Sequence, residues 1–591
     1  MRPPRKIEKE VPVDPPIDPG RQLVRTSLAD AHSLGQRVAD FFERLTWRTP
    51  IHDLRLKGRH PTKLVALPGD PLTGDLELGE GLLAGLLHWR GETKPVAEID
   101  LRDRRASAVL WEHLHSFRWL RDLATVPDRP AATRVAEETM ARWLVAVGER
   151  TGDAAWAPAL CGRRLLMWFA HGPLLLSSTD LIFRSSVLNA IARSARHLDR
   201  TADKADAGAP RIAAWSAVVA AGLLVPGAET RRAVGEAGLS RALAASVSAD
   251  GGVVSRSGLA QIEAIELIAM LRAAYDARRL EAPAVIGETL TRMVPALLGI
   301  AMGDGGLASW QSAPPVPSAA VKRVIAAGGV QGCPLRQARD WGYQRMVAGR
   351  TLLVMDAAPP PLAPPPGGGC ASTLAFELSD GEDRVVVNCG GAAIAPRYAD
   401  ALRTTAAHST LTIDDSNSTA ILADGSLGRG VVEVELSRQE SEGGSRIEAS
   451  HDGYARRHGF VHRRLLTLAG TGAEIRGEDS LLPSGRSGRG RQTPFALRFH
   501  LGPGIRAAAT GDGTGAILRT PAGAIWQFRC RDGLTLEESL WIDAEGRAVA
   551  TQQIVVAGTA DAGGASIAWT MTRALTRTLE ATGMSRKGAA P

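Results

Sequence analysis

Residues 403–413 read RTTAAHSTLTI, and two aspartates follow them directly. His408 stands between small residues and a β-branched run that predicts a strand ending at those aspartates. A second block, residues 451–465, reads HDGYARRHGFVHRRL. It places Tyr454 just after a turn and His462 within a strand, where successive side chains alternate between the two faces. The two blocks therefore bring histidine and tyrosine chemistry into a β-rich part of the chain.

Around these blocks, the spacing of apolar residues divides the chain into two parts. From about residue 80 to 310, apolar residues recur at helical spacing between Gly, Pro and Asp. Beyond about residue 335, short alternating segments bounded by turn residues predict an antiparallel β-sandwich. The predicted fold class is α+β multidomain, with an (α/α) toroid or incomplete barrel followed by the sandwich. The predicted helices span 107–123, 131–148, 163–176, 186–198, 212–224, 241–249, 261–277 and 285–302.

The same change of pattern gives the domain boundaries. We expect a disordered tail at 1–25, a helical domain at 26–335, a β-sandwich at 336–578 and a disordered tail at 579–591. Within the helical domain, the pattern predicts a helix at 27–45 and a small hairpin in the region 51–80. Residues 357–369 are rich in proline and glycine, and strands flank them on both sides. We therefore interpret them as a stiff loop within the sandwich.

Composition limits the classes of function. The chain has 591 residues, too many for one core, and a net charge of +7 that would favour an acidic polymer. Its five cysteines are scattered and contain no CxxC pair, which argues against a disulfide framework or a cysteine zinc site. No phosphate-binding loop, nucleophile elbow or nucleic-acid module occurs, so we expect no nucleic-acid partner. Without a signal peptide or an apolar span, the chain is expected to be cytoplasmic and to have no membrane partner.

Four sequence blocks resemble the heparinase II/III-like family of polysaccharide lyases. Two of them are the blocks around His408 and His462. The third is residues 111–123, WEHLHSFRWLRDL, and the fourth is Asp250-Gly251-Gly252 followed by Ser255-Arg256-Ser257. The resemblance implies an (α/α) toroid followed by a β-sandwich, and β-elimination of a uronate-bearing, glycosaminoglycan-like polysaccharide. It also leaves a periplasmic location open, because such polymers are usually met there.

The resemblance assigns chemical roles to individual residues. His408 would be the acid/base group and Tyr454 the proton donor, since β-elimination removes a C5 proton and protonates a leaving oxygen. Arg211 or Arg256 would neutralise the uronate carboxylate. The remaining predicted substrate contacts are Trp119, Trp310 and Arg403. A buried histidine that satisfies loop carbonyls, and tryptophans that belong to the core, are the structural alternatives.

The helical half departs from the family pattern. Where active relatives carry an Asn-His pair, this chain has Ala209 and Pro210, and the tyrosine expected near residues 259–261 is absent. This departure supports a second hypothesis, a catalytically inactive carbohydrate-binding or assembly protein on the same scaffold. A weaker third hypothesis is a hydrolase that uses Glu263 and Glu266, which lie on one predicted helix.

No cofactor is required for the predicted chemistry. Some relatives hold a structural zinc or calcium ion in the sandwich, and the resemblance would give that ion His462 with Asp414 or Asp415 as ligands. The predicted partner is an acidic polysaccharide or oligosaccharide. The sequence leaves the oligomeric state undetermined.

Overall fold

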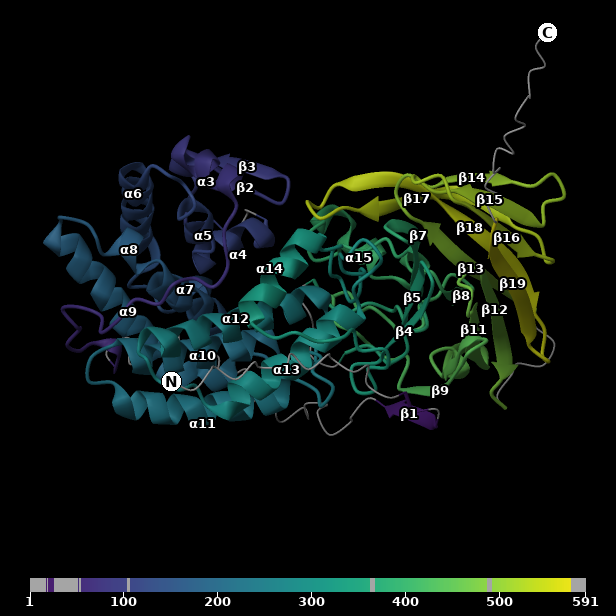
Figure 1. The fold of residues 1–591 in the computed structure, drawn as a ribbon, viewed down its shortest axis with the longest axis horizontal. Helices are drawn as coiled ribbons and strands as arrows, with labels where there is room; N and C mark the ends of the chain where they lie inside the picture. Colours follow the sequence, from purple (N-terminus) through teal and green to yellow (C-terminus); the bar gives the residue numbers. More distant parts are fainter. Residues whose placement is uncertain are drawn as a thin grey trace, which may run out of the picture.

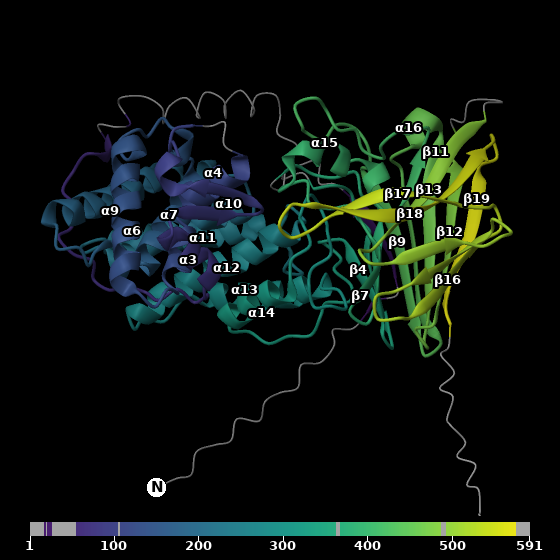
Figure 2. The same cartoon turned by 90° about the horizontal axis from the view of Figure 1, so that it is seen from above.

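The computed structural model describes residues 17–18, 20–25, 52, 55–103, 107–361, 367–485 and 492–574. Helices occupy one end of the molecule and two β-sheets the other, as Figures 1 and 2 show from two directions. The helical part followed by an antiparallel sandwich confirms the predicted fold class. The helix predicted at 27–45 lies outside the described residues.

Most predicted helices form at or near their expected positions. Their apolar faces converge on one core, which also receives side chains from the first strands of the sandwich. The main helices are α3 (Leu76–Leu83), α4 (Ala108–Ser116), α5 (Trp119–Leu123), α6 (Arg129–Val147), α7 (Pro158–Ala170), α8 (Gly172–Leu175), α9 (Leu181–Thr201), α10 (Ala209–Leu224), α11 (Glu229–Ser246), α12 (Gly258–Ala277), α13 (Ala284–Gly299) and α14 (Ser318–Gly328).

The structure corrects three local predictions. The helix expected at 107–123 breaks at Phe117, whose left-handed backbone (φ 60°) ends α4 before α5 begins. The early hairpin is formed by β2 (Leu86–Trp89) and β3 (Glu92–Pro95) rather than by residues 51–80. Part of the tail expected to be disordered is strand β1 (Arg21–Arg25), which pairs with β9 (Glu433–Ser441). The local sequence pattern of residues 21–25 does not reveal a pairing with residues more than 400 positions later.

The second half of the chain forms two antiparallel sheets. One has the order β1-β9-β10-β11-β12-β19-β16-β15-β14, and the other the order β17-β18-β13-β7-β6-β5-β4, with β8 added on β13. The remaining strands are β4 (Tyr343–Ala348), β5 (Thr351–Asp356), β6 (Phe376–Asp380), β7 (Asp383–Val387), β8 (Leu411–Ile413), β10 (Gly444–His451), β11 (Phe460–Ala469), β12 (Glu474–Pro483), β13 (Thr493–Leu501), β14 (Arg506–Ala509), β15 (Gly515–Arg519), β16 (Ile525–Cys530), β17 (Thr535–Ile542), β18 (Ala548–Ala560) and β19 (Ala565–Arg573).

Strand β5 joins the two cores. Every residue of it is buried, unlike β11, in which buried and half-buried residues alternate. Leu352 and Val354 pack into the helical core, whereas Leu353 and Met355 pack into the core between the sheets. A strand covered on both faces needs apolar residues at every position, which explains the run TLLVM. The described parts of the proline-rich segment, 357–361 and 367–369, come between β5 and β6 and so belong to the sandwich part of the chain, as predicted.

Candidate functional site

His408 lies at the junction of the two domains, immediately after a short 3₁₀ turn (Thr405–Ala407) and before β8. Its ring is 1% exposed, and Nδ1 is 2.7 Å from the carbonyl oxygen of Thr404. A carbonyl only accepts, so Nδ1 carries the proton and donates it, which leaves a lone pair on Nε2. Burial lowers the pKa of His408 to about 4, against the smaller opposing effects of the Thr404 carbonyl and Asp356. The ring is therefore neutral at pH 7.

Sequence analysis missed Asp356, at the end of β5, whose charge acts on His408. Its carboxylate accepts from Arg256 Nη2 (2.6 Å), Ser372 Oγ (2.7 Å) and Gln311 Nε2 (3.3 Å). Leu374 N–H donates to the backbone carbonyl of Asp356 (2.7 Å). Three of these partners, Arg256, Gln311 and Leu374, have left-handed backbones (φ 56°, 48° and 66°) although none is glycine. Such strain persists only where surrounding contacts enforce it, so this cluster is a rigid junction.

His500 lies beside the His408 loop and is equally enclosed. Its Nε2–H donates to the carbonyl of Ala406 (2.9 Å), and its Nδ1 accepts from the Ser539 hydroxyl (2.8 Å). Cys389 Sγ is 3.6 Å from the same Nδ1. Burial lowers the pKa of His500 to about 4 and raises that of Cys389 to about 12. A neutral imidazole beside a protonated thiol has no activated nucleophile, so this trio holds the loop in place.

Tyr454 belongs to the core between the sheets. It is 1% exposed, and its hydroxyl donates to the carbonyl of Leu411 (2.8 Å). Burial raises its pKa above the ordinary value. The hydroxyl of Tyr454, the predicted proton donor, is thus hydrogen-bonded to the backbone inside the protein.

The predicted arginine contacts are also engaged internally. Arg256 pairs with Asp356 and donates through Nε to Trp341 O (2.7 Å). Arg403 is 4% exposed and donates to Gly369 O (2.8 Å) and Gly425 O (2.7 Å). Arg211 is half-buried and donates through Nε to Ala205 O (2.9 Å). Of these three, Arg211 is the one whose guanidinium remains partly open to solvent.

The two predicted stacking tryptophans lie in the helical core. Trp119 is 1% exposed and donates to Leu114 O (3.2 Å). Trp310 is fully buried, with its ring centroid 5.5 Å from that of Tyr343. Neither ring has an exposed face on which a sugar could stack, so both tryptophans are core residues.

Between α4, α5, α7 and α12, the helical domain contains a network of ion pairs. Arg118 pairs with Glu266, and Arg163 pairs with both Glu263 (3.0 Å) and Glu112 (2.5 Å). Burial alone would lower the pKa of Arg118, but Glu266 and Glu263 raise it overall. These arginines therefore have their counter-ions inside the protein. The same pairing occupies Glu263 and Glu266, the carboxylates of the hydrolase hypothesis.

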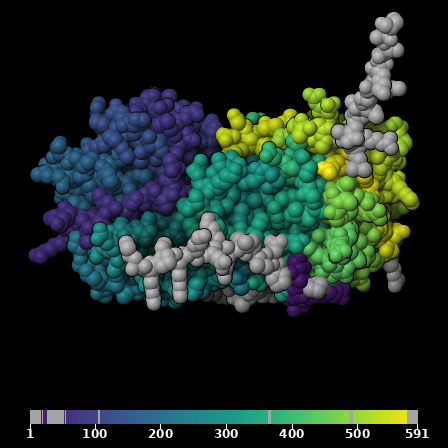
Figure 3. Space-filling model, in the orientation of Figure 1, coloured from purple at the N-terminus to yellow at the C-terminus, as the bar shows by residue number. Residues whose placement is uncertain are grey.

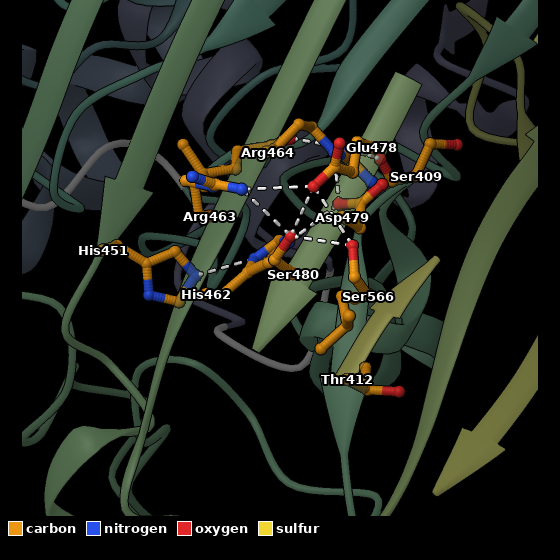
Figure 4. Close-up of polar contacts among 12 residues, drawn as sticks. Ser409, Thr412, His451, His462, Arg463, Arg464, Glu478, Asp479, Ser480 and Ser566 are labelled. Atoms are coloured by element: carbon orange, nitrogen blue, oxygen red, sulfur yellow. Dashed lines mark hydrogen bonds and ion pairs between the residues drawn. The ribbon is translucent and has the colours of Figure 1, made fainter. Parts of the chain in front are cut away.

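The structure pairs His462 with Asp479 instead of Asp414 (Figure 4). Asp479, on β12, accepts from His462 Nε2 (2.8 Å), Arg464 Nε (2.8 Å) and Trp569 Nε1 (3.0 Å). Burial would raise the pKa of Asp479, but Arg464 and His462 hold it well below the usual range. Among the described residues, no group of three or more His, Cys, Asp or Glu side chains could hold a metal ion.

A second histidine extends this network. Gly453 N–H donates to His451 Nδ1 (3.1 Å), so the proton of His451 is on Nε2, which lies 3.3 Å from His462 Nδ1. His462 then carries its own proton on Nε2 and gives it to Asp479. Burial lowers the pKa of both histidines, which makes the chain of neutral rings self-consistent. On β11, His462 and Arg464 are thus buried in the interior of the sandwich and hydrogen-bonded there.

Comparisons with known proteins agree with this fold. Residues 331–570 match the family model described as heparinase II/III-like, C-terminal. The second half of the chain is therefore similar to the C-terminal domain of the heparinase II/III-like family. The crystal structure of heparinase III superposes with a TM-score of 0.66 at 13% identity, covering 92% of this chain and 90% of that one. The heparan sulfate lyase HepC of Pedobacter heparinus gives a TM-score of 0.56 at 15% identity, covering 91% and 88%.

A relative of similar length carries a different name. FtsZ-localized protein C of Caulobacter vibrioides is 29% identical over 569 residues, which covers 91% of this chain and 95% of the relative. The likeness therefore extends through the helical domain as well as the sandwich. In the described part of the chain, no helix is long and apolar enough to cross a membrane.

Proposed function

We propose that this heparinase II/III-like protein acts by binding rather than by catalysis, and that it localises with FtsZ. The observation that carries the proposal is the engagement of the predicted proton-transfer groups by the protein itself. Tyr454 donates to a backbone carbonyl within the sandwich core, and His408 is 1% exposed with its Nδ1 proton given to Thr404. Ala209 and Pro210 replace the Asn-His pair that the family resemblance assigns to the helical domain.

Charge compensation supports the same proposal. A uronate polymer needs uncompensated cations in the cleft, because its carboxylates must be neutralised before the C5 proton can leave. Arg118, Arg163 and Arg256 have their carboxylate partners within the protein. Recruiting any of them to a substrate would leave a partner carboxylate unpaired, at a cost of about 1–3 kcal/mol or more. The FtsZ assignment comes from the relative, whose likeness covers both domains.

The proposal is tested by imaging a fluorescent fusion of this protein together with FtsZ in its own organism. We expect the fusion to coincide with FtsZ and to disperse when FtsZ is depleted. His408→Gln, which keeps a side-chain N–H for Thr404, should localise like the wild type. A distribution that is indifferent to FtsZ depletion would refute the proposal.

One observation favours a lyase as a second candidate. Because the proton of His408 is on Nδ1, which donates to Thr404 O, the ring retains a lone pair on Nε2. A small opening of the loop would let it meet a sugar. The test is absorbance of unsaturated uronate with a panel of acidic polysaccharides, with wild type and His408→Gln side by side. A rise that His408→Gln abolishes would establish the lyase, whereas equal baselines would leave binding as the function.

A further inference from the structure

A groove on the helical domain lies between α9, α10 and α11. It has a volume of about 240 Å³ and is lined by Asp199, Trp215, Val218, Thr230, Arg231 and Val234. Trp215 and Val218 are buried beneath it, whereas Val234 on α11 is 59% exposed. Helix α9 lies at the end of the helical domain away from the sandwich (Figures 1 and 2). The groove is thus separate from the His408 junction.

Glycines on α11 create the floor of this groove. A Cβ at Gly238 would lie 2.2 Å from the ring of Trp215, and one at Gly235 would lie 3.0 Å from Val219. Because glycine has no Cβ, α11 approaches α10 closely and Trp215 packs directly against α11. The indole Nε1–H also donates to Asp203 (3.0 Å), which fixes the ring. The floor is therefore a preformed apolar surface, as small binding sites usually are.

One edge of the groove is basic. Arg231 lines it and pairs with Asp199 (2.9 Å), the acidic residue at that edge. Arg196 and Arg200 lie on the same helix as Asp199, one turn apart. Burial lowers the pKa of Arg196, and the positive charges of Arg231 and Arg200 lower it further. Of these three arginines, only Arg231 forms an ion pair with Asp199, whereas Arg196 and Arg200 donate to backbone carbonyls.

A neighbouring surface segment adds to this charge. Arg196 Nη1 donates to Leu56 O (3.0 Å) and Nη2 donates to Arg59 O, which holds the exposed Lys57 and Arg59 beside α9. The purple strip crossing the helical domain in Figure 3 includes this segment. Within the described residues, no carboxylate forms an ion pair with Lys57, Arg59 or Arg200. The surface of α9 beside the groove thus carries positive charge that has no ion-pair partner among the described residues.

We propose that this groove, the α9–α11 groove, binds a short segment of a partner protein in which apolar side chains are followed by Asp or Glu residues. The apolar side chains would occupy the hollow over Trp215 and Val218. The acidic residues would meet Arg200, Lys57 and Arg59, because opposite charges at a solvent-exposed edge steer and orient a partner.

Two other polyanions fit the groove less well. Binding of single-stranded nucleic acid relies on aromatic side chains that stack with bases, and the exposed lining residues of the groove, Asp199, Thr230 and Val234, include no aromatic one. A membrane surface binds a broad apolar face of a helix. Here the apolar surface is a hollow, and its residues Trp215 and Val218 are buried at the bottom, where a flat membrane surface would not reach them. The location of the groove makes this inference independent of localisation with FtsZ.

The inference is tested by fluorescence anisotropy with the full-length protein. The probe is a fluorescein-labelled peptide with two leucines followed by a run of glutamates. Matched peptides replace the leucines by serine or the glutamates by lysine. We expect saturable binding of the first peptide alone, weakened about tenfold by Arg200→Glu or by Val234→Glu. Val145→Glu, at an 84% exposed position on α6, is the matched control and should bind like the wild type.

Thermal unfolding of each variant excludes misfolding, since all three positions are on the surface. Vesicles of phosphatidylcholine with phosphatidylglycerol are tested in parallel by sedimentation. Equal binding of the glutamate and lysine peptides, or binding that Val234→Glu leaves unchanged, would overturn the inference. So would sedimentation with vesicles that the same two variants abolish while the peptide remains unbound.

Discussion

The ion pair between Arg256 and Asp356 allows a decisive test of how the two domains are held together. Arg256 belongs to the loop before α12, and Asp356 ends β5 in the sandwich. The Asp356 side chain is fully buried and that of Arg256 is 6% exposed. We consider Arg256→Leu, which removes the charge and keeps a side chain that fills part of the space.

The expected cost follows from the burial of the partner. Removing one member of a buried ion pair destabilises a protein by about 3–5 kcal/mol, because the remaining charge is uncompensated. Ser372 and Gln311 still donate to Asp356, whereas Trp341 O and Pro359 O lose their charged donor. We expect a loss of about 4 kcal/mol, a large part of the roughly 5–15 kcal/mol that stabilises a typical protein. In Arg256→Leu with Asp356→Asn, the charge is gone, so at least about 2 kcal/mol should return.

The measurement is urea unfolding followed by tryptophan fluorescence, with hydrogen exchange of residues 341–358 to report the junction separately. Two probes are needed because a two-domain protein need not unfold in one step. If Arg256→Leu alone lies within about 1 kcal/mol of the wild type, the clamp does not exist as described. A double variant as unstable as the sum of the two single variants would refute the charge argument.

Three further results are expected. Asp479→Asn should destabilise the sandwich by about 3 kcal/mol in urea unfolding, because the buried Arg464 loses its counter-ion; an unchanged midpoint would contradict this. Gly238→Ala should lower the thermal midpoint, since the clash with Trp215 (about 1–3 kcal/mol) exceeds the gain of about 1 kcal/mol in helix propensity; an unchanged or raised midpoint would show that α11 moves freely. Acid should destabilise the fold between about pH 6.5 and pH 4. In this range a histidine such as His500 binds a proton in the unfolded chain but stays neutral in the folded one, because burial lowers its pKa to about 4. Each such histidine costs about 1.4 kcal/mol of stability per pH unit. His500→Gln should flatten that slope in pH-dependent unfolding, and a parallel slope would exclude His500 as a contributor.

Local pattern predicted much of this fold. The helical spacing in the first half and the alternation in the second half gave the two domains, and the His408 and His462 blocks indicated the family. These features are readable because helices and strands impose short repeats on the residues that face a core. Phe117 shows the limit, since its left-handed backbone breaks a helix whose apolar spacing continues through it.

The candidate site needed the tertiary structure. The family resemblance suggested that Arg256 would meet a substrate and that His462 would share a metal with Asp414 or Asp415. In the fold, Arg256 meets Asp356, a hundred residues later, and His462 meets Asp479 on the neighbouring strand. By itself, the sequence determined which segments are helices or strands and which residues carry chemistry. Only the tertiary structure decided which charges are neighbours and which are buried, because strand order and domain docking bring together residues that no local repeat connects.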